Sequence, residues 1–120
     1  FKALDDLIAL GVTRVLTSGQ RESAIKGAKT VKKMIEYASG RVDILPGGGI
    51  NTQNVGEFIN ETGTHSVHAS ARSLRHDTSV CGNPEIFFGG KLNGVGIPED
   101  EYKVTDSALV QNVVAAIEAR

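Results

Sequence analysis

The order of strand-like and helix-like segments is the feature that most restricts the fold of this chain. Three short segments rich in β-branched and apolar residues have the length of strands, at residues 12–17, 42–45 and 64–70. Segments with apolar residues three and four positions apart lie before, between and after them, at residues 1–10, 22–39, 51–62 and 106–119. Strands that alternate with helices pair in parallel through right-handed crossovers. The sequence therefore predicts an α/β fold with three parallel strands, adjacent in chain order and covered by helices on one side.

The ends of the predicted helices carry residues that commonly start or stop a helix. Asn51 or Thr52 is placed to cap the third helix, and Gly63 is placed to end it. Thr105 or Asp106 is placed to cap the last helix in the same way.

The segment between the third strand and the last helix has neither periodicity. Residues 71–103 are rich in glycine and charge, and we expect a long irregular segment there that serves a function or an oligomer contact. Three parallel strands also leave two open edges, which a larger sheet or barrel would protect. The opening residues read as a helix already under way, so the chain resembles a section of a larger protein.

Composition excludes several classes of function. The 120 residues suit one small domain, and the formal net charge of −1 argues against a nucleic-acid partner or an anionic membrane surface. The longest apolar run is too short for a membrane span, and no secretory signal opens the chain. The single cysteine, Cys81, rules out an internal disulfide and fits a reducing cytosol. We therefore expect a cytoplasmic protein.

Three consecutive glycines, Gly47, Gly48 and Gly49, lie between the second predicted strand and the third predicted helix. Backbone N–H groups in such a turn can point at a phosphate or carboxylate, and the helix dipole favours negative charge there. The alternative is that the glycines only supply positive φ for a tight turn. The run matches no nucleotide-binding motif, because Thr52 stands where a dinucleotide fingerprint needs glycine.

Three segments resemble, in this order and spacing, the C-terminal half of CutC copper homeostasis proteins: residues 13–20 (TRVLTSGQ), 45–50 (LPGGGI) and 67–72 (VHASAR). The resemblance implies a TIM (β/α)₈ barrel in which residues 1–120 are the C-terminal portion of a single domain and hold strands six to eight. It also implies a role in copper homeostasis, with copper as the implied ion. The strands that come first in such a barrel are absent from this sequence.

The barrel reading brings several candidate site residues to one end of the sheet. Phosphate commonly binds at the loops after strands seven and eight, which here would hold the three glycines and Ser70 to Arg72. Arg72 could pair with the anion, or it could be an ordinary surface or salt-bridged arginine. His68 is the candidate general acid or base, with a structural hydrogen bond as the alternative. The sequence leaves open whether the protein is an enzyme.

Copper(I) prefers sulfur ligands, and the chain has one cysteine, one methionine and three histidines. Met34 reads as core filler, and His65 and His68 would point to opposite faces of a strand. Some relatives carry cysteine where this chain has Gln20 and Ala69. We predict no site with two or more sulfur or imidazole ligands within this chain, which leaves Cys81 as the remaining candidate metal ligand.

Three hypotheses of function follow. The first is a CutC-like copper-handling protein that binds copper ions. The second is a TIM-barrel enzyme or binding protein for a small phosphorylated or carboxylated ligand held at residues 47–49, with Gly47, Gly48, Gly49, Ser70 and Arg72 as the anion-binding residues. The third is a subunit whose long segment after Arg72 makes a homo-oligomer contact.

Overall fold

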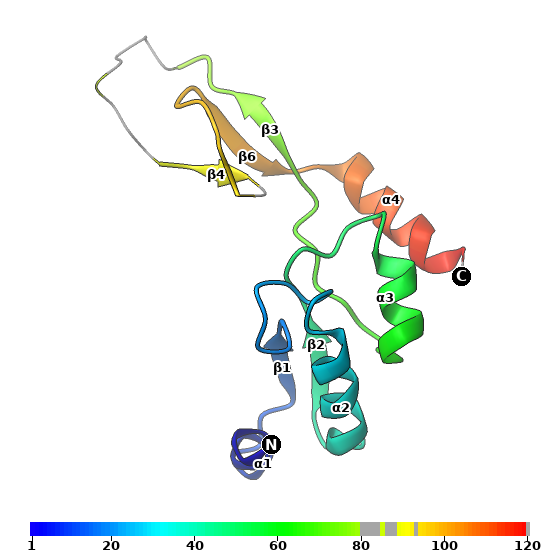
Figure 1. Cartoon of the computed structure of the whole chain (residues 1–120). Helices are drawn as coiled ribbons and strands as arrows, with labels where there is room; N and C mark the ends of the chain where they lie inside the picture. The colour runs from blue at the N-terminus through cyan, green and yellow to red at the C-terminus, as the bar shows by residue number, and fades with distance from the viewer. Residues whose placement is uncertain (80–84, 86–88, 93, 120) are drawn as a thin grey trace.

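The computed structural model describes residues 1–79, 85, 89–92 and 94–119. The elements in chain order are α1 (Lys2–Ala9), β1 (Arg14–Thr17), α2 (Ala28–Ala38), β2 (Asp43–Pro46), α3 (Val55–Thr62), β3 (Arg72–His76), β4 (Lys91–Leu92), β5 (Val95–Gly96), β6 (Glu101–Thr105) and α4 (Ser107–Glu118). Figure 1 shows an α/β part formed by residues up to α3, and an arm of antiparallel strands that extends away from it. None of the described helices is long and apolar enough to cross a membrane.

The strands β1 and β2 pair in parallel, which confirms the predicted pairing of residues 12–17 with residues 42–45. Val15 lies opposite Ile44 and Leu16 opposite Leu45 in this register. Ile44 is 4% exposed and Leu16 is 58% exposed, so helices cover one face of the strand pair and leave the other bare.

The third predicted strand, at residues 64–70, is not a strand in the structure. The segment runs beside β2 in parallel, but only one bridge joins them, between Gly47 and His68, where the His68 N–H donates to the Pro46 carbonyl at 2.8 Å. At its start, the Thr64 hydroxyl donates to the Ser66 carbonyl at 2.8 Å. Such local side-chain bonds compete with a strand ladder, which explains the correction.

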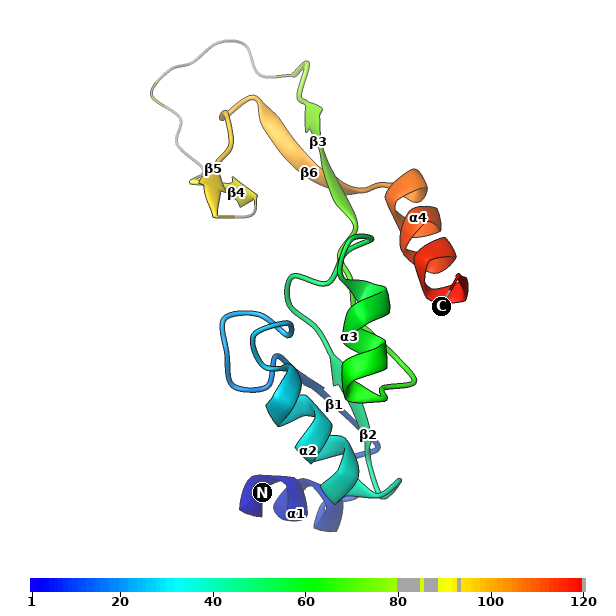
Figure 2. The same ribbon diagram turned by 45° about the vertical axis from the view of Figure 1, so that its right-hand side comes forward.

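The hydrophobic core lies between the covered face of the strands and the helices α2 and α3. Its most buried members include Val31 of α2 and Val55 and Phe58 of α3, all at most 2% exposed. The view in Figure 2 separates α2 and α3 from the strand pair behind them.

Two helices begin later than the sequence predicted. The helix expected at residues 22–39 begins at Ala28, with Gly27 as its N-cap, and the backbone at Gly27 passes so close to Ser18 and Gly19 that no side chain fits there. The helix expected at residues 51–62 begins at Val55. Its N-cap is Asn54 rather than Asn51 or Thr52, whereas Gly63 ends it with a φ of 71°, as predicted.

The segment expected to be irregular at residues 71–103 instead contains, among its described residues, the strands β3, β4 and β5 and the start of β6. β3 pairs antiparallel with β6 from Arg72↔Thr105 to His76↔Glu101, and β4 pairs antiparallel with β5. Residues on both faces of β3 are largely exposed, so no apolar alternation marks the strand in the sequence.

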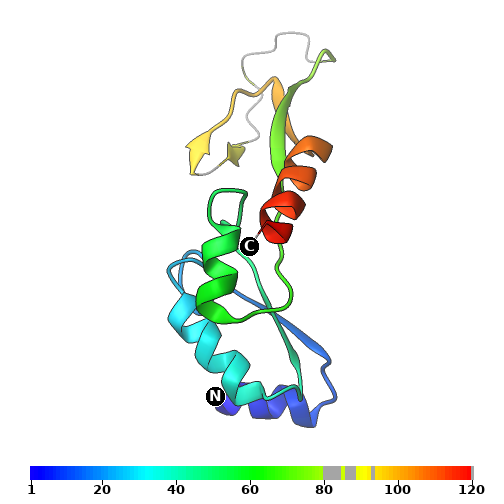
Figure 3. The ribbon, with the colours of Figure 1, turned by 90° about the vertical axis from the view of Figure 1, so that its right-hand side faces the viewer.

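The helix α4 returns from the arm to pack against α3, as Figure 3 shows. Asp106 is its N-cap, one of the two predicted caps, and its Oδ1 accepts from the Ala108 N–H at 2.9 Å and the Leu109 N–H at 3.3 Å. Gly56 of α3 faces the Ala116 carbonyl of α4, where a Cβ would lie at 3.6 Å. The close approach brings the buried Val113 next to the end of β2.

Candidate functional site

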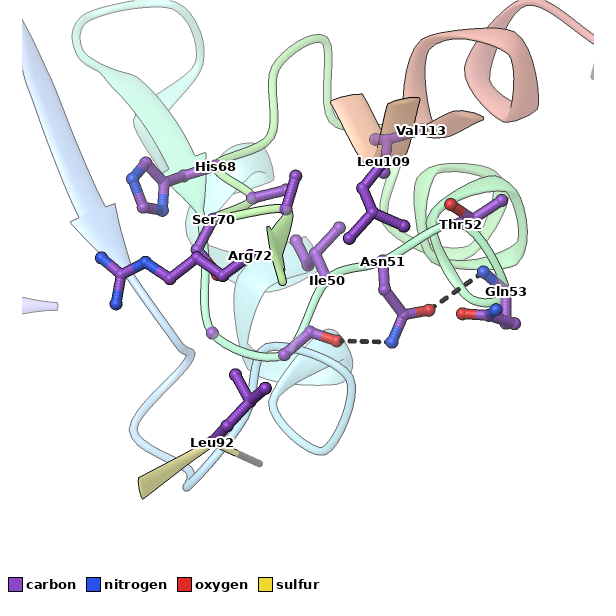
Figure 4. Close-up of a pocket in the computed structure, with 14 residues that line it drawn as sticks. Ile50, Asn51, Thr52, Gln53, His68, Ser70, Arg72, Leu92, Leu109 and Val113 are labelled. Atoms are coloured by element: carbon purple, nitrogen blue, oxygen red, sulfur yellow. Dashed lines mark hydrogen bonds between the residues drawn. The ribbon is translucent and has the colours of Figure 1, made fainter. Parts of the chain in front are cut away.

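A cavity of about 410 Å³ lies at the carboxyl end of β2, between the α/β part and the start of the arm (Figure 4). Three regions of the chain line it. These are the glycine turn with the start of the third helical region, residues 48–53; the segment that enters β3, residues 68–72; and three apolar side chains from the arm and α4, Leu92, Leu109 and Val113.

The backbone of the glycine turn is held from behind. The Gly48 carbonyl accepts from the Ala24 N–H at 2.8 Å, and the Gly49 carbonyl accepts from Asn54 Nδ2 at 2.9 Å. Gly48 has a φ of 110° and Gly49 a φ of 76°, so both adopt the backbone region that favours glycine. The carbonyls of the turn are therefore anchored to neighbouring loops.

The N–H groups of the same turn, unlike its carbonyls, make no hydrogen bond to the neighbouring loops among the described residues. Among the described residues, no atom accepts a hydrogen bond from the N–H of Gly48, Gly49 or Ile50. Gly48 and Gly49 are exposed and line the cavity. Exposed, unpaired amides in a turn can donate to a bound oxyanion.

Gly47 has a different place from the other two glycines. It is buried, does not line the cavity, and bridges to His68. A Cβ on Gly47 would lie 2.9 Å from Leu16 Cδ1 and 3.1 Å from His68 Cβ. Gly47 thus lets the chain segments approach closely, whereas the other predicted anion-binding residues (Gly48, Gly49, Ser70 and Arg72) are brought together around the cavity.

The side chains of His68 and Arg72 extend to the same side of the cavity in Figure 4. Both are exposed, and within the part of the chain that the structure describes neither side chain has a hydrogen-bond or ion-pair partner. The structure therefore provides neither the structural hydrogen bond considered for His68 nor the salt bridge considered for Arg72. Arg72 is an unpaired cation at the rim of a site with unpaired amides.

The loop after β1 supports the glycine turn from outside. Ser23 lies against Gly49, with its Cβ 3.4 Å from where a Cβ on the glycine would be. The Ser18 hydroxyl donates to the Arg21 carbonyl at 2.6 Å, which holds this loop in shape. Ser18 is thus a turn residue.

The described residues contain no group of three or more His, Cys, Asp or Glu side chains that could hold a metal ion. Met34 packs at the edge of the hydrophobic core, in agreement with its reading as core filler. Cys81, the remaining candidate ligand, lies outside the described residues.

Sequence reasoning did not find the apolar side of the cavity. Leu109 and Val113 carry an ordinary helical periodicity, and nothing local shows that α4 packs against α3 at the end of β2. Leu92 lies in a two-residue strand inside the segment that we expected to be irregular. Only the tertiary path of the arm brings these three side chains to the glycine turn.

Comparison with known proteins gives consistent matches. The model of the CutC family matches residues 1–73. A CutC family protein from Treponema denticola is 43% identical over 116 residues, which cover 97% of this chain and 46% of that protein. The human copper homeostasis protein cutC homolog is 38% identical over 113 residues, which cover 94% of this chain and 40% of that protein.

A solved structure agrees with these matches. The crystal structure of a CutC protein from Streptococcus agalactiae is 39% identical and superposes with a TM-score of 0.52 over 56% of this chain and 33% of that one. The chain spans somewhat less than half the length of the curated relatives it matches. By sequence and by structure, this chain belongs to the CutC family.

Proposed function

We propose that this chain takes part in copper homeostasis as the C-terminal portion of a CutC protein in the cytoplasm. The observation that carries the proposal is its identity of 38% to a human protein named for copper homeostasis, over 94% of this chain. The experiment is removal of the gene from its host, followed by growth across a copper series and measurement of total cell copper. We expect altered copper tolerance that the intact gene restores, and unchanged tolerance and copper content would overturn the proposal.

The architecture we propose is a section of a TIM barrel that holds strands six to eight. β1 and β2 are parallel, residue 68 runs beside β2 in the same direction, and the core helices α2 and α3 pack on one face. The cavity lies at the carboxyl end of these strands, which is where barrels of this kind hold their ligands.

Direct binding of copper is a separate question from a role in copper homeostasis. The described residues offer no cluster of sulfur and imidazole ligands, so we expect the chain to lose Cu(I) to a competing chelator. Equilibrium titration with Cu(I) and the chelator measures this, with Cys81→Ser as the matched variant. One copper held per chain, and lost in Cys81→Ser, would establish a site that this account lacks.

The second candidate function is binding of a small phosphorylated or carboxylated ligand at the glycine turn. The unpaired amides of Gly48, Gly49 and Ile50, with the unpaired Arg72 across the cavity, favour it. Ser70 would add a hydroxyl donor, and His68 would be the acid or base of any reaction there.

Inorganic phosphate is the probe for this site. We expect binding in the millimolar range, weakened about tenfold in Arg72→Gln because a charge-assisted contact is lost. Arg75→Gln is the matched control, since Arg75 is exposed on the same strand and does not line the cavity. Equal affinities of the two variants would show that Arg72 does not reach the anion.

A further inference from the structure

The cavity at the glycine turn has two unlike walls. One wall is polar and carries the amides of residues 48–50, the Ser70 hydroxyl and the Arg72 guanidinium. The other is apolar and is built from Leu109 and Val113 of α4, while Leu92 lies on the far side of the glycine turn. Figure 4 shows the glycine turn between Leu92 on one side and Leu109 with Val113 on the other.

The size of the cavity is larger than a bare anion needs. Its volume of about 410 Å³ falls in the range of cavities that hold small organic molecules. An inorganic phosphate occupies only a few times the volume of a water molecule, which is about 30 Å³ in the liquid. An anion seated at the amides would therefore leave the apolar wall without a contact.

The apolar wall is a fixed part of the fold. Val113 is 8% exposed and belongs to the core cluster. Asp106 caps α4 and fixes its start, and α4 packs against α3. Leu109, one turn before Val113, therefore keeps its place at the cavity without a ligand.

The polar wall offers more donors than a carboxylate can use. Three backbone N–H groups without an acceptor among the described residues, one hydroxyl and a guanidinium belong to residues that line it. A carboxylate brings two oxygens, and a phosphate monoester brings three charged oxygens and an ester oxygen that leads away from them. The donor set favours the phosphate.

We propose that the cavity binds an organic monophosphate with a small apolar group, whose phosphate contacts Gly48, Gly49 and Arg72 and whose apolar group contacts Leu109 and Val113. This inference rests on the anion site proposed above and adds the class of ligand. The ester oxygen directs the organic group away from the amides, toward the apolar wall.

The experiment compares methyl phosphate, n-butyl phosphate and butyrate by ligand-observed NMR on the 120-residue chain. Three additional methylenes that become buried should make n-butyl phosphate bind at least about tenfold more tightly than methyl phosphate. Butyrate should bind more weakly than n-butyl phosphate. Circular dichroism of each variant verifies that it is folded.

Variants separate the two walls. Leu109→Ala should reduce the preference for butyl over methyl phosphate to about twofold or threefold, and should leave the affinity for methyl phosphate within about twofold. Val110→Ala is the matched control, because Val110 is the next residue of α4, is 41% exposed and does not line the cavity. Leu109→Val is the second variant if Leu109→Ala does not fold, and it should reduce the preference in the same direction but by less.

The outcomes distinguish this inference from the anion site itself. If inorganic and methyl phosphate bind and n-butyl phosphate binds no more tightly, the anion site stands and the inference that its ligand carries an apolar group is wrong. If butyrate binds more tightly than n-butyl phosphate, the phosphate assignment is wrong. If none of the phosphates binds at millimolar concentration, the anion site and the inference fall together.

Discussion

Asp106 shows how much a single residue does in this chain. Its side chain caps α4 by accepting from two backbone N–H groups, and α4 in turn carries one wall of the cavity. The hydrogen bond from Ser73 holds the pKa of Asp106 below its ordinary value of 3.8, with the bonds from the helix N–H groups and the nearby charge of Arg75 as further causes. The capping bonds are therefore stronger when the carboxylate is ionised.

Acid should weaken this cap. Because the pKa of Asp106 is lower in the folded chain, its contribution is present above the unfolded pKa and is lost as the pH falls through the folded value. We expect Asp106→Asn, which keeps an N-cap acceptor, to lower the melting temperature less at pH 3 than at pH 7. Thermal unfolding at both pH values measures this, and an equal loss at both would contradict it.

Tyr37 connects α2 to α1 through its hydroxyl group. Its OH donates to Asp5 Oδ2 at 2.6 Å, and its ring stacks on Phe1 at a centroid distance of 4.7 Å. The hydrogen bond to Asp5 raises the pKa of Tyr37 above its ordinary value of 10.0, with burial and the charge of Asp5 as further causes. Because the pKa of Tyr37 is higher in the folded chain, its hydroxyl stabilises the fold fully at pH values below the unfolded pKa. This contribution to stability is lost as the pH rises through the folded pKa.

Alkaline pH should therefore remove part of the link between these two helices. We expect Tyr37→Phe to lower the melting temperature at pH 8, where the hydroxyl is protonated and bonded. Between pH 8 and about pH 11 the melting temperature of the unsubstituted chain should fall further, and this fall should be smaller in Tyr37→Phe. The ring stack remains in this variant, so it isolates the hydroxyl. The same pH dependence in both proteins would assign the alkaline loss to other groups.

At the scale of elements, the sequence predicted the strands and the helix cap whose signals lie in a few neighbouring residues. The strands near Val15 and Ile44 and the cap at Asp106 follow from alternation, apolar runs and turn chemistry. The antiparallel pair of β3 and β6 did not follow, because residues such as Arg72 and Arg75 are exposed and leave no apolar face to detect.

The candidate site divides in the same way. The sequence placed Gly48, Gly49, Ser70 and Arg72 together, because loops that follow parallel strands meet at one end of a sheet. The apolar side of the cavity could not be predicted, since it depends on how a helix more than 50 residues away from the glycine turn packs against α3.

Two glycines should respond in opposite ways to the same substitution. Gly27 precedes α2, and a methyl group there would overlap the backbone of Ser18, so Gly27→Ala should cost about 1 to 3 kcal/mol. Gly56 lies inside α3 with ordinary contact space toward α4, so Gly56→Ala should stabilise by about 0.5 kcal/mol through helix propensity. The urea concentration at half-unfolding, compared with that of the unsubstituted chain under the same conditions, gives the direction of each change, and a lower midpoint in both variants would mean that the helix contact at Gly56 is tighter than the structure shows.

At the scale of the whole molecule, the chain is extended. Its radius of gyration is 17.6 Å, and its principal extents are 54, 34 and 23 Å. A compact domain of this length has a radius of gyration of about 14 Å. The bare face of the strand pair, with Leu16 at 58% exposed, adds apolar surface that a compact domain would bury. The relatives are roughly twice as long, and additional chain in them would be available to cover such a face.

Isolated, the 120-residue chain should associate through this bare face. Within the described residues β1 pairs only with β2, so its other edge is open next to the exposed Leu16, and open apolar edges pair with other chains. We expect a molar mass that rises with concentration in sedimentation experiments, together with broad, poorly reversible unfolding. Leu16→Lys should reduce the association strongly, because a charge on an edge strand opposes pairing, whereas Ala9→Lys adds the same charge to the exposed side of α1 and should leave it unchanged. A monomer at all concentrations that unfolds in one sharp, reversible transition would show that the strand pair and its helices are self-sufficient.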